Sequence, residues 1–263
     1  MKLESTPVII LCGGAGTRMK EETEFRPKPL IEVGGMPIIW HIMKIYFHHG
    51  FNHFILPLGY KGNVIKDYFM NYEWMSNDFT LNLHSRDRHF HYKRKLEDWN
   101  ITFVDTGLQT NTGGRLKKSE RFIREDEFML TYGDGVGDVD IRALLAFHRS
   151  KGVIATLTAV HPMSSYGVLD VEDSGFLKGF KEKPRLDGLI NAGFFVFNRR
   201  IFEYLDEDTV LEQEPMARLA ADHQLAVFHH RGFWKSMDTY KDQQLLNQLW
   251  HEKNSPQWKV WED

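Results

Sequence analysis

The 263-residue sequence predicts an α/β fold in which helices flank a doubly wound, mostly parallel sheet. Two observations lead to this fold class. Short apolar runs alternate with helical patterns over about the first 150 residues, and the first run ends in a cluster of glycines. After residue 160 a hairpin pattern replaces the alternation. We therefore expect one domain, 1–263, with a parallel half at about 1–150 and a more antiparallel half at about 151–263.

The elements of the first half follow from local patterns. Val8 to Cys12 is a continuous apolar run, typical of a buried strand. Residues 38–49 carry apolar side chains at helical spacing, and Gly50 follows where such a helix would end. The segment 84–99 is polar, charged and aromatic, which predicts an excursion from the core. The other expected elements are strands at 53–58, 79–83, 101–105, 127–135 and 152–160, and helices at 62–72, 113–124 and 141–150.

The second half has a different pattern. Residues 166–183 read as a hairpin, with Asp173, Ser174 and Gly175 at its turn. Further strands are expected at 191–198 and 225–230, with helical stretches on either side of the latter. The final expected element is a helix at 239–253 with a leucine stripe.

Composition excludes several classes of protein. Lys and Arg number 33 against 36 Asp and Glu, so the net charge of −3 provides no basic field for nucleic acid or anionic lipid. Cys12 is the single cysteine, which precludes an internal disulfide and fits a reducing compartment. No apolar run is long enough to serve as a signal peptide or to cross a membrane. These features predict a cytoplasmic protein.

The glycine-rich turn after the first strand is the first candidate binding feature. Gly13, Gly14 and Gly16 would let backbone N–H groups approach a phosphate closely, because no Cβ intervenes. The P-loop pattern is absent, and the dinucleotide pattern G-x-G-x-x-G fails because its third glycine would fall on Met19. The latter speaks against a nicotinamide-dependent oxidoreductase. Taken alone, the turn could equally be a tight connection in the sheet.

Two cations near the turn favour phosphate binding. Arg18 can grip a phosphate through two N–H groups, and Lys28 supplies a compact charge. Pro27 and Pro29 restrict the backbone on both sides of Lys28 and so help to fix its direction. The combination suits a triphosphate better than a dinucleotide.

An acidic residue lies at the end of the fifth predicted strand, residues 127–135. Asp134 would lie at the carboxyl end of a central strand, where open α/β sheets bind ligands. It is a candidate Mg²⁺ ligand, because Mg²⁺ bound to phosphates typically takes one or two protein carboxylates. Asp238 is the natural second ligand. The alternatives are a helix or turn cap for Asp134 and the N-cap of the last helix for Asp238.

Several stretches resemble a known family. "GGAGTRMKEET…RPKP" is similar to the signature of sugar-1-phosphate nucleotidyltransferases. "VDTG…TGGRLKK", "YGDGVGD", "FKEKP" and "GFWKSMDT" resemble more narrowly the branch that transfers a cytidylyl group from CTP to glucose 1-phosphate, giving CDP-glucose. The resemblance runs in order from Val8 to about Trp261. It implies a Rossmann-like mixed sheet, a nucleotide-binding first half, a sugar-phosphate-binding second half, and a homo-oligomer.

The resemblance also implies roles for particular residues. Arg18, Lys28 and Asp134 would be catalytic, and Asp134 with Asp238 would hold Mg²⁺. The implied CTP site comprises Leu11, Cys12, Gly13, Gly14, Ala15, Gly16, Thr17, Arg18, Lys28, Thr110, Arg115 and Gly133. The implied sugar-phosphate site comprises Tyr166, Gly167, Glu182, Lys183 and Asn191.

The implied chemistry is direct in-line attack of the sugar phosphate on the α-phosphorus of CTP. Because the attacking phosphate is already anionic, no general base is needed, and catalysis rests on alignment and on cations. Two alternatives stay open: the same transfer with another nucleotide or sugar 1-phosphate, and a non-catalytic nucleotide-binding regulator. The presence of every charged residue that the chemistry requires argues against the regulator.

Overall fold

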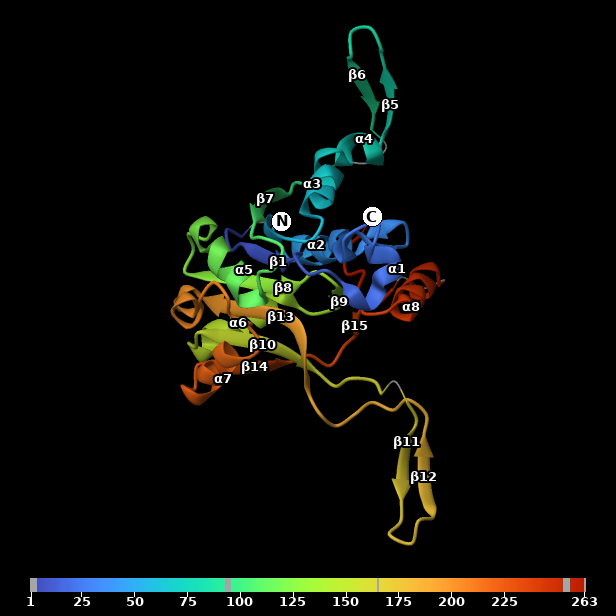
Figure 1. Ribbon diagram of the computed structural model, residues 1–263, viewed down its shortest axis with the longest axis vertical. Coiled ribbons are helices and arrows are strands. Elements are labelled where there is room, and N and C mark those ends of the chain that lie inside the picture. Colours follow the sequence, from blue (N-terminus) through green and yellow to red (C-terminus); the bar gives the residue numbers. More distant parts are fainter. Residues whose placement is uncertain (1–3, 93–95, 165, 253–255, 263) are drawn as a thin grey trace.

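The computed structural model describes residues 4–92, 96–164, 166–252 and 256–262 (Figure 1). Seven strands form one sheet in the order β14-β10-β13-β8-β1-β4-β7. Neighbouring strands are parallel except where β13 pairs with β10 and β8, which confirms a mostly parallel mixed sheet. The strands are β1 Val8–Leu11, β4 His53–Leu58, β7 Asn100–Asp105, β8 Glu127–Tyr132, β10 Ala155–Val160, β13 Ile190–Asn198 and β14 Leu225–His229.

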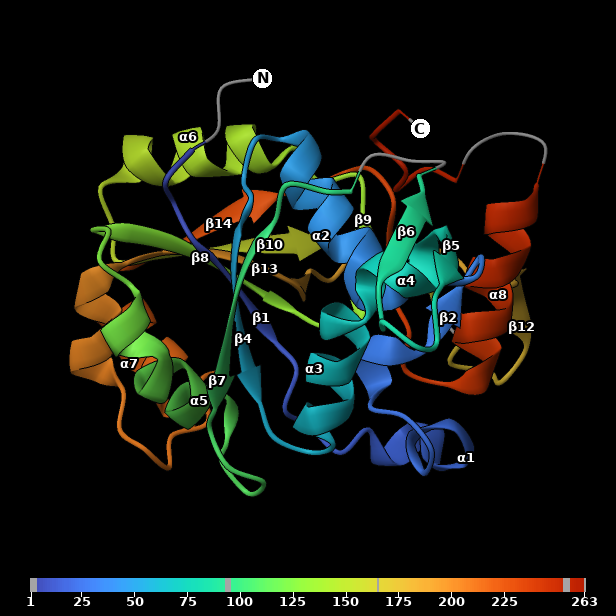
Figure 2. The same cartoon turned by 90° about the horizontal axis from the view of Figure 1, so that it is seen from above.

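Helices cover both faces of this sheet. Apolar residues of α2 and α6 pack on one face, and those of α5 and α7 pack on the other (Figure 2). The α-helices are α1 Lys20–Thr23, α2 Ile38–His48, α3 Gly62–Met70, α4 Tyr72–Ser76, α5 Thr112–Ser119, α6 Ile141–Lys151, α7 Glu214–Ala221 and α8 Tyr240–His251. The 3₁₀ helices are η1 Thr17–Met19, η2 Lys28–Leu30, η3 Glu120–Phe122 and η4 Arg199–Tyr204.

The core follows from the two-residue period of a strand. Along β1, Val8 and Ile10 contribute to one buried cluster, while Ile9, between them, belongs to the cluster on the opposite face. A strand buried on both faces needs a continuous apolar run, which is why the first run of the sequence marks the centre of the sheet. Within the described residues, no helix is both long and apolar enough to cross a lipid bilayer.

Pro57 illustrates how the sheet tolerates a missing donor. It lies in β4, between β1 and β7. The β1 pairing involves Phe54 and Ile55 and ends before Pro57, so the absent N–H is not required on that side.

Some expected strands have different partners. The predicted strand at 79–83 is β5 Asp78–Leu81, which pairs with β6 Arg88–His91 in a separate hairpin and does not join the main sheet. The predicted excursion at 84–99 therefore lies largely in this hairpin, although residues 93–95 are outside the described part of the chain. Two small sheets were not expected from the sequence: β2 Glu32–Val33 with β3 Met36–Pro37, and β9 Gly135–Gly137 with β15 Trp234–Ser236.

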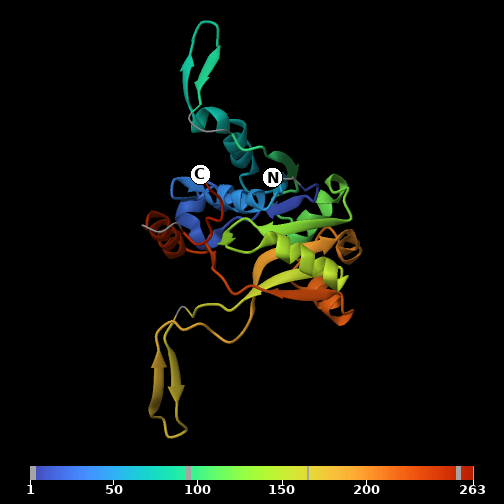
Figure 3. The same cartoon turned by 180° about the vertical axis from the view of Figure 1, so that it is seen from behind.

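Two arms project from opposite sides of the body (Figures 1 and 3). The first arm is the β5–β6 hairpin, which follows α4. The second arm is the predicted hairpin at 166–183, where β11 Val168–Val171 pairs with β12 Leu177–Lys181. Gly175 in its turn has a φ of +86°, a conformation that glycine adopts without strain.

The carboxyl ends of β1, β4, β7 and β8 meet at one edge of the sheet. Because β13 runs antiparallel to β8, its first residues reach the same edge. This carboxyl edge receives the glycine turn after β1, Asp134 after β8 and Asn191 at the start of β13. Open α/β sheets bind ligands at such an edge.

Candidate active site

Two adjoining cavities lie at the carboxyl edge. The larger measures about 440 Å³ and the smaller about 200 Å³, and Arg18, Tyr132 and Asp134 line both. The larger cavity is lined by Leu11, Cys12, Gly13, Gly14, Gly16, Thr17, Arg18, Lys28, Pro29, Thr110, Asn111, Thr112, Arg115, Tyr132, Gly133 and Asp134. The structure thus brings together every residue expected at the CTP site except Ala15, which lies in the same turn outside the lining.

The glycine turn owes its shape to a buried arginine. Arg115 donates to the carbonyl oxygens of Gly13 (3.0 Å) and Leu58 (3.1 Å), and its other acceptors are backbone carbonyls and a hydroxyl of the loop after β7. A Cβ at Gly13 would lie 2.1 Å from the guanidinium, so only glycine permits this approach. The guanidinium therefore holds the cavity wall through protein acceptors. Its contact with CTP stays a prediction.

Gly16 and Gly133 also have steric reasons for being glycine. Gly16 has a φ of +62° and begins η1, which carries Arg18. A Cβ at Gly133 would lie 2.7 Å from the carbonyl oxygen of Leu11, where β8 and β1 end side by side. Cys12 is buried, and burial raises the pKa of its thiol. This thiol is therefore a packing group with no nucleophilic character.

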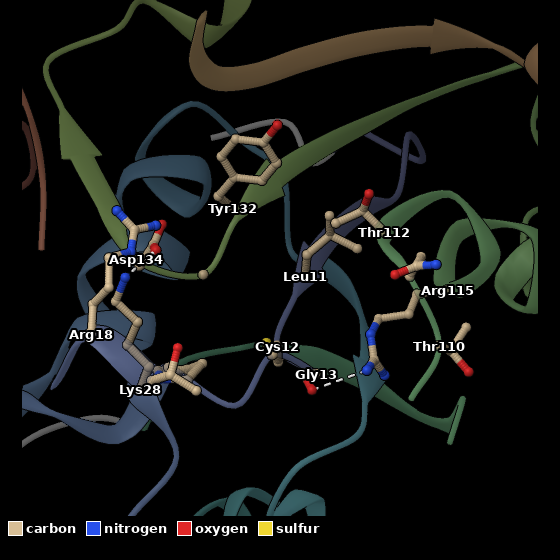
Figure 4. Close-up of a pocket in the computed structure, with 16 residues that line it drawn as sticks. Leu11, Cys12, Gly13, Arg18, Lys28, Thr110, Thr112, Arg115, Tyr132 and Asp134 are labelled. Carbon is tan, nitrogen blue, oxygen red and sulfur yellow. Dashed lines mark hydrogen bonds and ion pairs between the residues drawn. The ribbon is translucent and has the colours of Figure 1, made fainter. Parts of the chain in front are cut away.

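The charged residues meet at one end of the larger cavity (Figure 4). The Lys28 ammonium contacts Oδ2 of Asp134 at 2.6 Å and Oδ1 of Asp238 at 3.0 Å. Arg18 reaches the same Asp238 oxygen at 3.2 Å. Burial alone would raise the pKa of the Asp238 carboxyl, but Lys28, Ser236 and Arg18 outweigh burial and hold that pKa below its ordinary value. Asp238 is therefore ionised at neutral pH.

Asp238 is not the N-cap of the last helix. Thr239 caps α8, and its side chain and Asp242 form a reciprocal capping box. Asp242 Oδ2 also accepts a hydrogen bond from the backbone N–H of Asp238 at 3.1 Å. The Asp238 side chain is thereby free to point at Lys28, which removes the N-cap alternative raised by the sequence.

The donor set fits a magnesium–triphosphate. Asp134 and Asp238 converge closely enough for one ammonium to touch both, so a single cation could bridge them. Among the residues that the structure describes, no group of three or more His, Cys, Asp or Glu side chains could hold a metal ion. Two carboxylates suffice for Mg²⁺ when phosphate oxygens and waters complete the octahedron.

The smaller cavity lies on the β13 and β15 side. Asn191 lines it, as predicted for the sugar-phosphate site, together with Trp234, Ser236 and Asp238. Trp234 donates its indole N–H to the carbonyl of Ala192 at 2.7 Å, which fastens β15 to the start of β13. Trp234 lies in the stretch "GFWKSMDT", but no sequence pattern predicted a place in the site for it, because its strand, β15, has only three residues.

The other residues expected at the sugar-phosphate site lie on the second arm. Tyr166, Gly167, Glu182 and Lys183 line neither cavity. Glu182 and Lys183 pair with each other at 3.3 Å. Lys183 has a φ of +44°, in the left-handed region that residues other than glycine seldom adopt. One chain does not bring these four residues to its own cavity.

Comparisons with known proteins decide the family. A family model described as "Nucleotidyl transferase" matches residues 7–249. The chain belongs to this family. Glucose-1-phosphate cytidylyltransferase of Salmonella typhi is 49% identical over 97% of this chain and 99% of its own length. A probable glucose-1-phosphate cytidylyltransferase of Bacillus subtilis is 47% identical over 96% of this chain and 99% of its own length.

The fold has solved counterparts. The crystal structure of HddC from Yersinia pseudotuberculosis in complex with GMP-PN superposes with a TM-score of 0.67 at 20% identity, covering 92% of this chain and 98% of that one. This likeness concerns the fold. With the family model and the relatives, it makes the chain a nucleotidyltransferase enzyme built on a mostly parallel α/β sheet.

Proposed function

We propose that this chain transfers a cytidylyl group from CTP to α-D-glucose 1-phosphate, giving CDP-glucose and pyrophosphate. The observation that carries the proposal is 49% identity to a glucose-1-phosphate cytidylyltransferase along 97% of the chain. The cavities add a physical reason. Two basic and two acidic side chains, Arg18, Lys28, Asp134 and Asp238, converge where the larger cavity adjoins a second cavity large enough for part of a sugar. The single-domain organisation is part of this proposal, since strands from both halves share one sheet.

The reaction follows from the placement of charge. A phosphate oxygen of glucose 1-phosphate forms a bond to the α-phosphorus of CTP, while the bond from that phosphorus to the pyrophosphate oxygen breaks. Lys28 and Arg18, which lie beside Asp134 and Asp238, would stabilise the negative charge that accumulates during this exchange. The glycine turn, held by Arg115, would orient the nucleotide phosphates.

The same proposal assigns Asp134 and Asp238 to Mg²⁺. Bound there, the metal would supply further positive charge to the phosphate oxygens. The Lys28 ammonium, which bridges the two carboxylates, would then turn to phosphate oxygens that lie beside them. With or without Mg²⁺, the two carboxylates are therefore paired with a cation, either the metal or the Lys28 ammonium. This cation offsets the repulsion between them.

We further propose that the protein acts as a homo-oligomer in which the second arm reaches a neighbouring copy. The arm exposes large apolar side chains, including Leu169 (57% exposed), Phe176 (74%) and Phe180 (58%). An isolated two-stranded hairpin is only marginally stable, and such apolar exposure indicates a protein contact. A second copy would cover these side chains. The arm residue Lys183 would then lie at the cavity of that second copy.

The substrate assignment has a direct test. Pyrophosphate release is measured with CTP, UTP, dTTP and GTP, each against a panel of sugar 1-phosphates that includes glucose, galactose and mannose. We expect the highest turnover with CTP and glucose 1-phosphate. Faster turnover with UTP or dTTP would remove the cytidylyl assignment, and no turnover with any pair would favour a non-catalytic role.

A further inference from the structure

A carboxylate outside both cavities connects residues that line them. Glu212 lies in the loop between η4 and α7. Its Oε1 accepts the hydroxyl of Tyr132 at 2.6 Å, and its Oε2 accepts the hydroxyl of Thr112 at 2.7 Å. Resting on the proposed function, we propose that Glu212 is a positioning residue that fixes Tyr132 as the partition between the two cavities. No stretch used to recognise the family contains it.

Tyr132 has the placement that a partition needs. It is the last residue of β8, two residues before Asp134, and it lines both cavities. Figure 4 shows its ring among the residues that line the larger cavity. Its ring packs over the backbone of Gly193, where a Cβ would lie 2.4 Å from the ring and where φ is +78°. The glycine therefore leaves room for the ring, but packing alone does not fix its hydroxyl end.

Hydrogen bonds fix that end. The Tyr132 oxygen also accepts from Nδ2 of Asn191 at 3.2 Å, so the hydroxyl joins Glu212 to the smaller cavity. Burial, followed by the nearby Glu212 carboxylate, raises the pKa of Tyr132 far above neutrality. The phenol therefore keeps its proton, which it donates to Glu212 in the structure.

The second oxygen of Glu212 leads to the larger cavity. Thr112 is the first residue of α5, and its hydroxyl also accepts from the backbone N–H of Leu211 at 3.0 Å. Three residues further along α5, Arg115 holds the carbonyl of Gly13. The Glu212 carboxylate thus connects α5, which supports the glycine turn through Arg115, to the ring of Tyr132, which lies between the two cavities. Loss of this carboxylate should misalign the two reactants and spare the fold.

The test compares Glu212→Ala, Glu212→Gln and Tyr132→Phe with two matched controls. Tyr204→Phe removes a similar tyrosine–carboxylate bond, to Asp222 at 2.9 Å, from a helix that lines neither cavity. Glu214→Gln changes a carboxylate two residues along, which pairs with Arg218 at 3.2 Å. Measured are kcat, KM for each substrate, CTP affinity by calorimetry, and the thermal midpoint.

We expect Glu212→Ala and Tyr132→Phe each to lower kcat about tenfold, the effect of one charge-assisted hydrogen bond that solvent partly screens. CTP affinity and thermal midpoint should match those of the controls. Glu212→Gln should recover most of the loss, because its amide oxygen still accepts the Tyr132 hydroxyl. A double variant that combines Glu212→Ala with Tyr132→Phe should be no slower than the slower single variant, since both changes break one connection.

Three results would overturn the proposal: kcat within twofold of wild type, additive losses in the double variant, or a loss that follows the thermal midpoint and that Gln does not restore. The outcome for the proposed function is separate. Wild-type protein that makes no CDP-glucose would refute that function, whereas active wild type with unaffected variants refutes only the role of Glu212.

Discussion

At the residue scale, Lys28 has the most direct connection to the chemistry. Its ammonium is the shared partner of Asp134 and Asp238, and its side chain is only 12% exposed. We expect Lys28→Ala to lower turnover by roughly 10²- to 10³-fold, since loss of one preorganised charge contact typically costs about 2–4 kcal/mol of transition-state stabilisation. Steady-state kinetics with CTP and glucose 1-phosphate measure the effect.

A matched control for Lys28 lies in the same segment. Lys20→Ala removes an exposed lysine of α1 that lines neither cavity and should leave turnover within twofold. Circular dichroism and thermal melting establish that both variants are folded. A folded Lys28→Ala variant with near-normal turnover would remove this residue from the mechanism.

From the burial of His41 we predict how the stability of the fold changes with pH. It is buried against the rings of Trp250 and Trp258, and its Nε2 contacts the carbonyl oxygen of Val33 at 2.8 Å. Burial lowers its pKa from 6.5 to about 4, despite opposing hydrogen bonds. As the pH falls, His41 is protonated in the unfolded chain before it is protonated in the folded one. The contribution of neutral His41 to the free energy of unfolding is therefore complete above pH 6.5 and is lost as the pH falls towards 4, by about 2 kcal/mol at pH 5.

The measurement is urea unfolding at pH 7 and pH 5 for wild type and His41→Gln. Gln keeps a donor for the Val33 carbonyl but cannot titrate, so the variant should lose less stability on acidification than wild type does. The exposed His84 provides the control, and His84→Gln should retain the wild-type difference. Equal acid sensitivity in wild type and His41→Gln would show that His41 does not contribute.

Residues differ in how far local sequence could identify them. The glycine turn, Arg18 and Lys28 lie within one segment of 16 residues, 13–28, so a short sequence motif was enough to identify them as candidate phosphate-binding residues. Tyr132 and Glu212 are 80 positions apart and meet only because β8 ends beside the loop before α7. A glutamate in a polar loop has no local pattern that predicts such a partner.

At the element scale, the start of α8 connects stability with the proposed metal site. The Asp242 carboxylate holds the N-cap Thr239 and also the backbone N–H of Asp238. We expect Thr239→Ala to lower the free energy of unfolding by about 1 kcal/mol through loss of the cap. It should also raise several-fold the Mg²⁺ concentration needed for half-maximal activity, because the Thr239 hydroxyl donates to the Asp242 carboxylate, which in turn holds the backbone N–H of Asp238.

Helix α6 offers the matched control for this cap. Asp140 caps it by accepting from the N–H of Ala143 at 2.9 Å, and no residue of α6 lines either cavity. Asp140→Ala should therefore cost similar stability without changing the Mg²⁺ requirement. If both variants shifted the Mg²⁺ requirement equally, a general loss of stability would explain the effect and the link to Asp238 would be wrong.

The elements that sequence predicted well are those with a strong period of their own. β4 and α2 were expected within one residue of their ends, because a continuous apolar run and a helical stripe are local signals. β15 was missed, since its three residues become a strand only by pairing with β9, almost 100 positions earlier. For β5 the sequence predicts a strand but not its pairing with β6 in a separate hairpin, because periodicity identifies a strand and not its partner.

At the scale of the whole molecule, the two arms are the main departure from a self-contained body. The second arm projects from the body (Figure 3) and includes Tyr166, Gly167, Glu182 and Lys183, none of which lines either cavity of its own chain. Sequence motifs identify these residues, but they do not show whether the residues act at the cavity of their own chain or at that of a neighbouring subunit. That depends on how the subunits assemble. A symmetric oligomer could exchange arms so that every cavity is completed by a neighbour.

Mixing two defective variants tests this exchange. Lys183→Ala damages the arm, and Asp134→Asn damages the cavity, so each alone should be nearly inactive. If arms serve neighbours, co-expressed subunits should regain about a quarter of wild-type activity, since half of the cavities and, independently, half of the arms that reach them are intact. Purification through two different affinity tags and light scattering establish that mixed oligomers have formed. The control mixes Lys28→Ala with Asp134→Asn, whose defects lie in the same cavity of each chain and should not complement. Mixed oligomers of the first pair that stay inactive would show that each arm folds back onto its own chain.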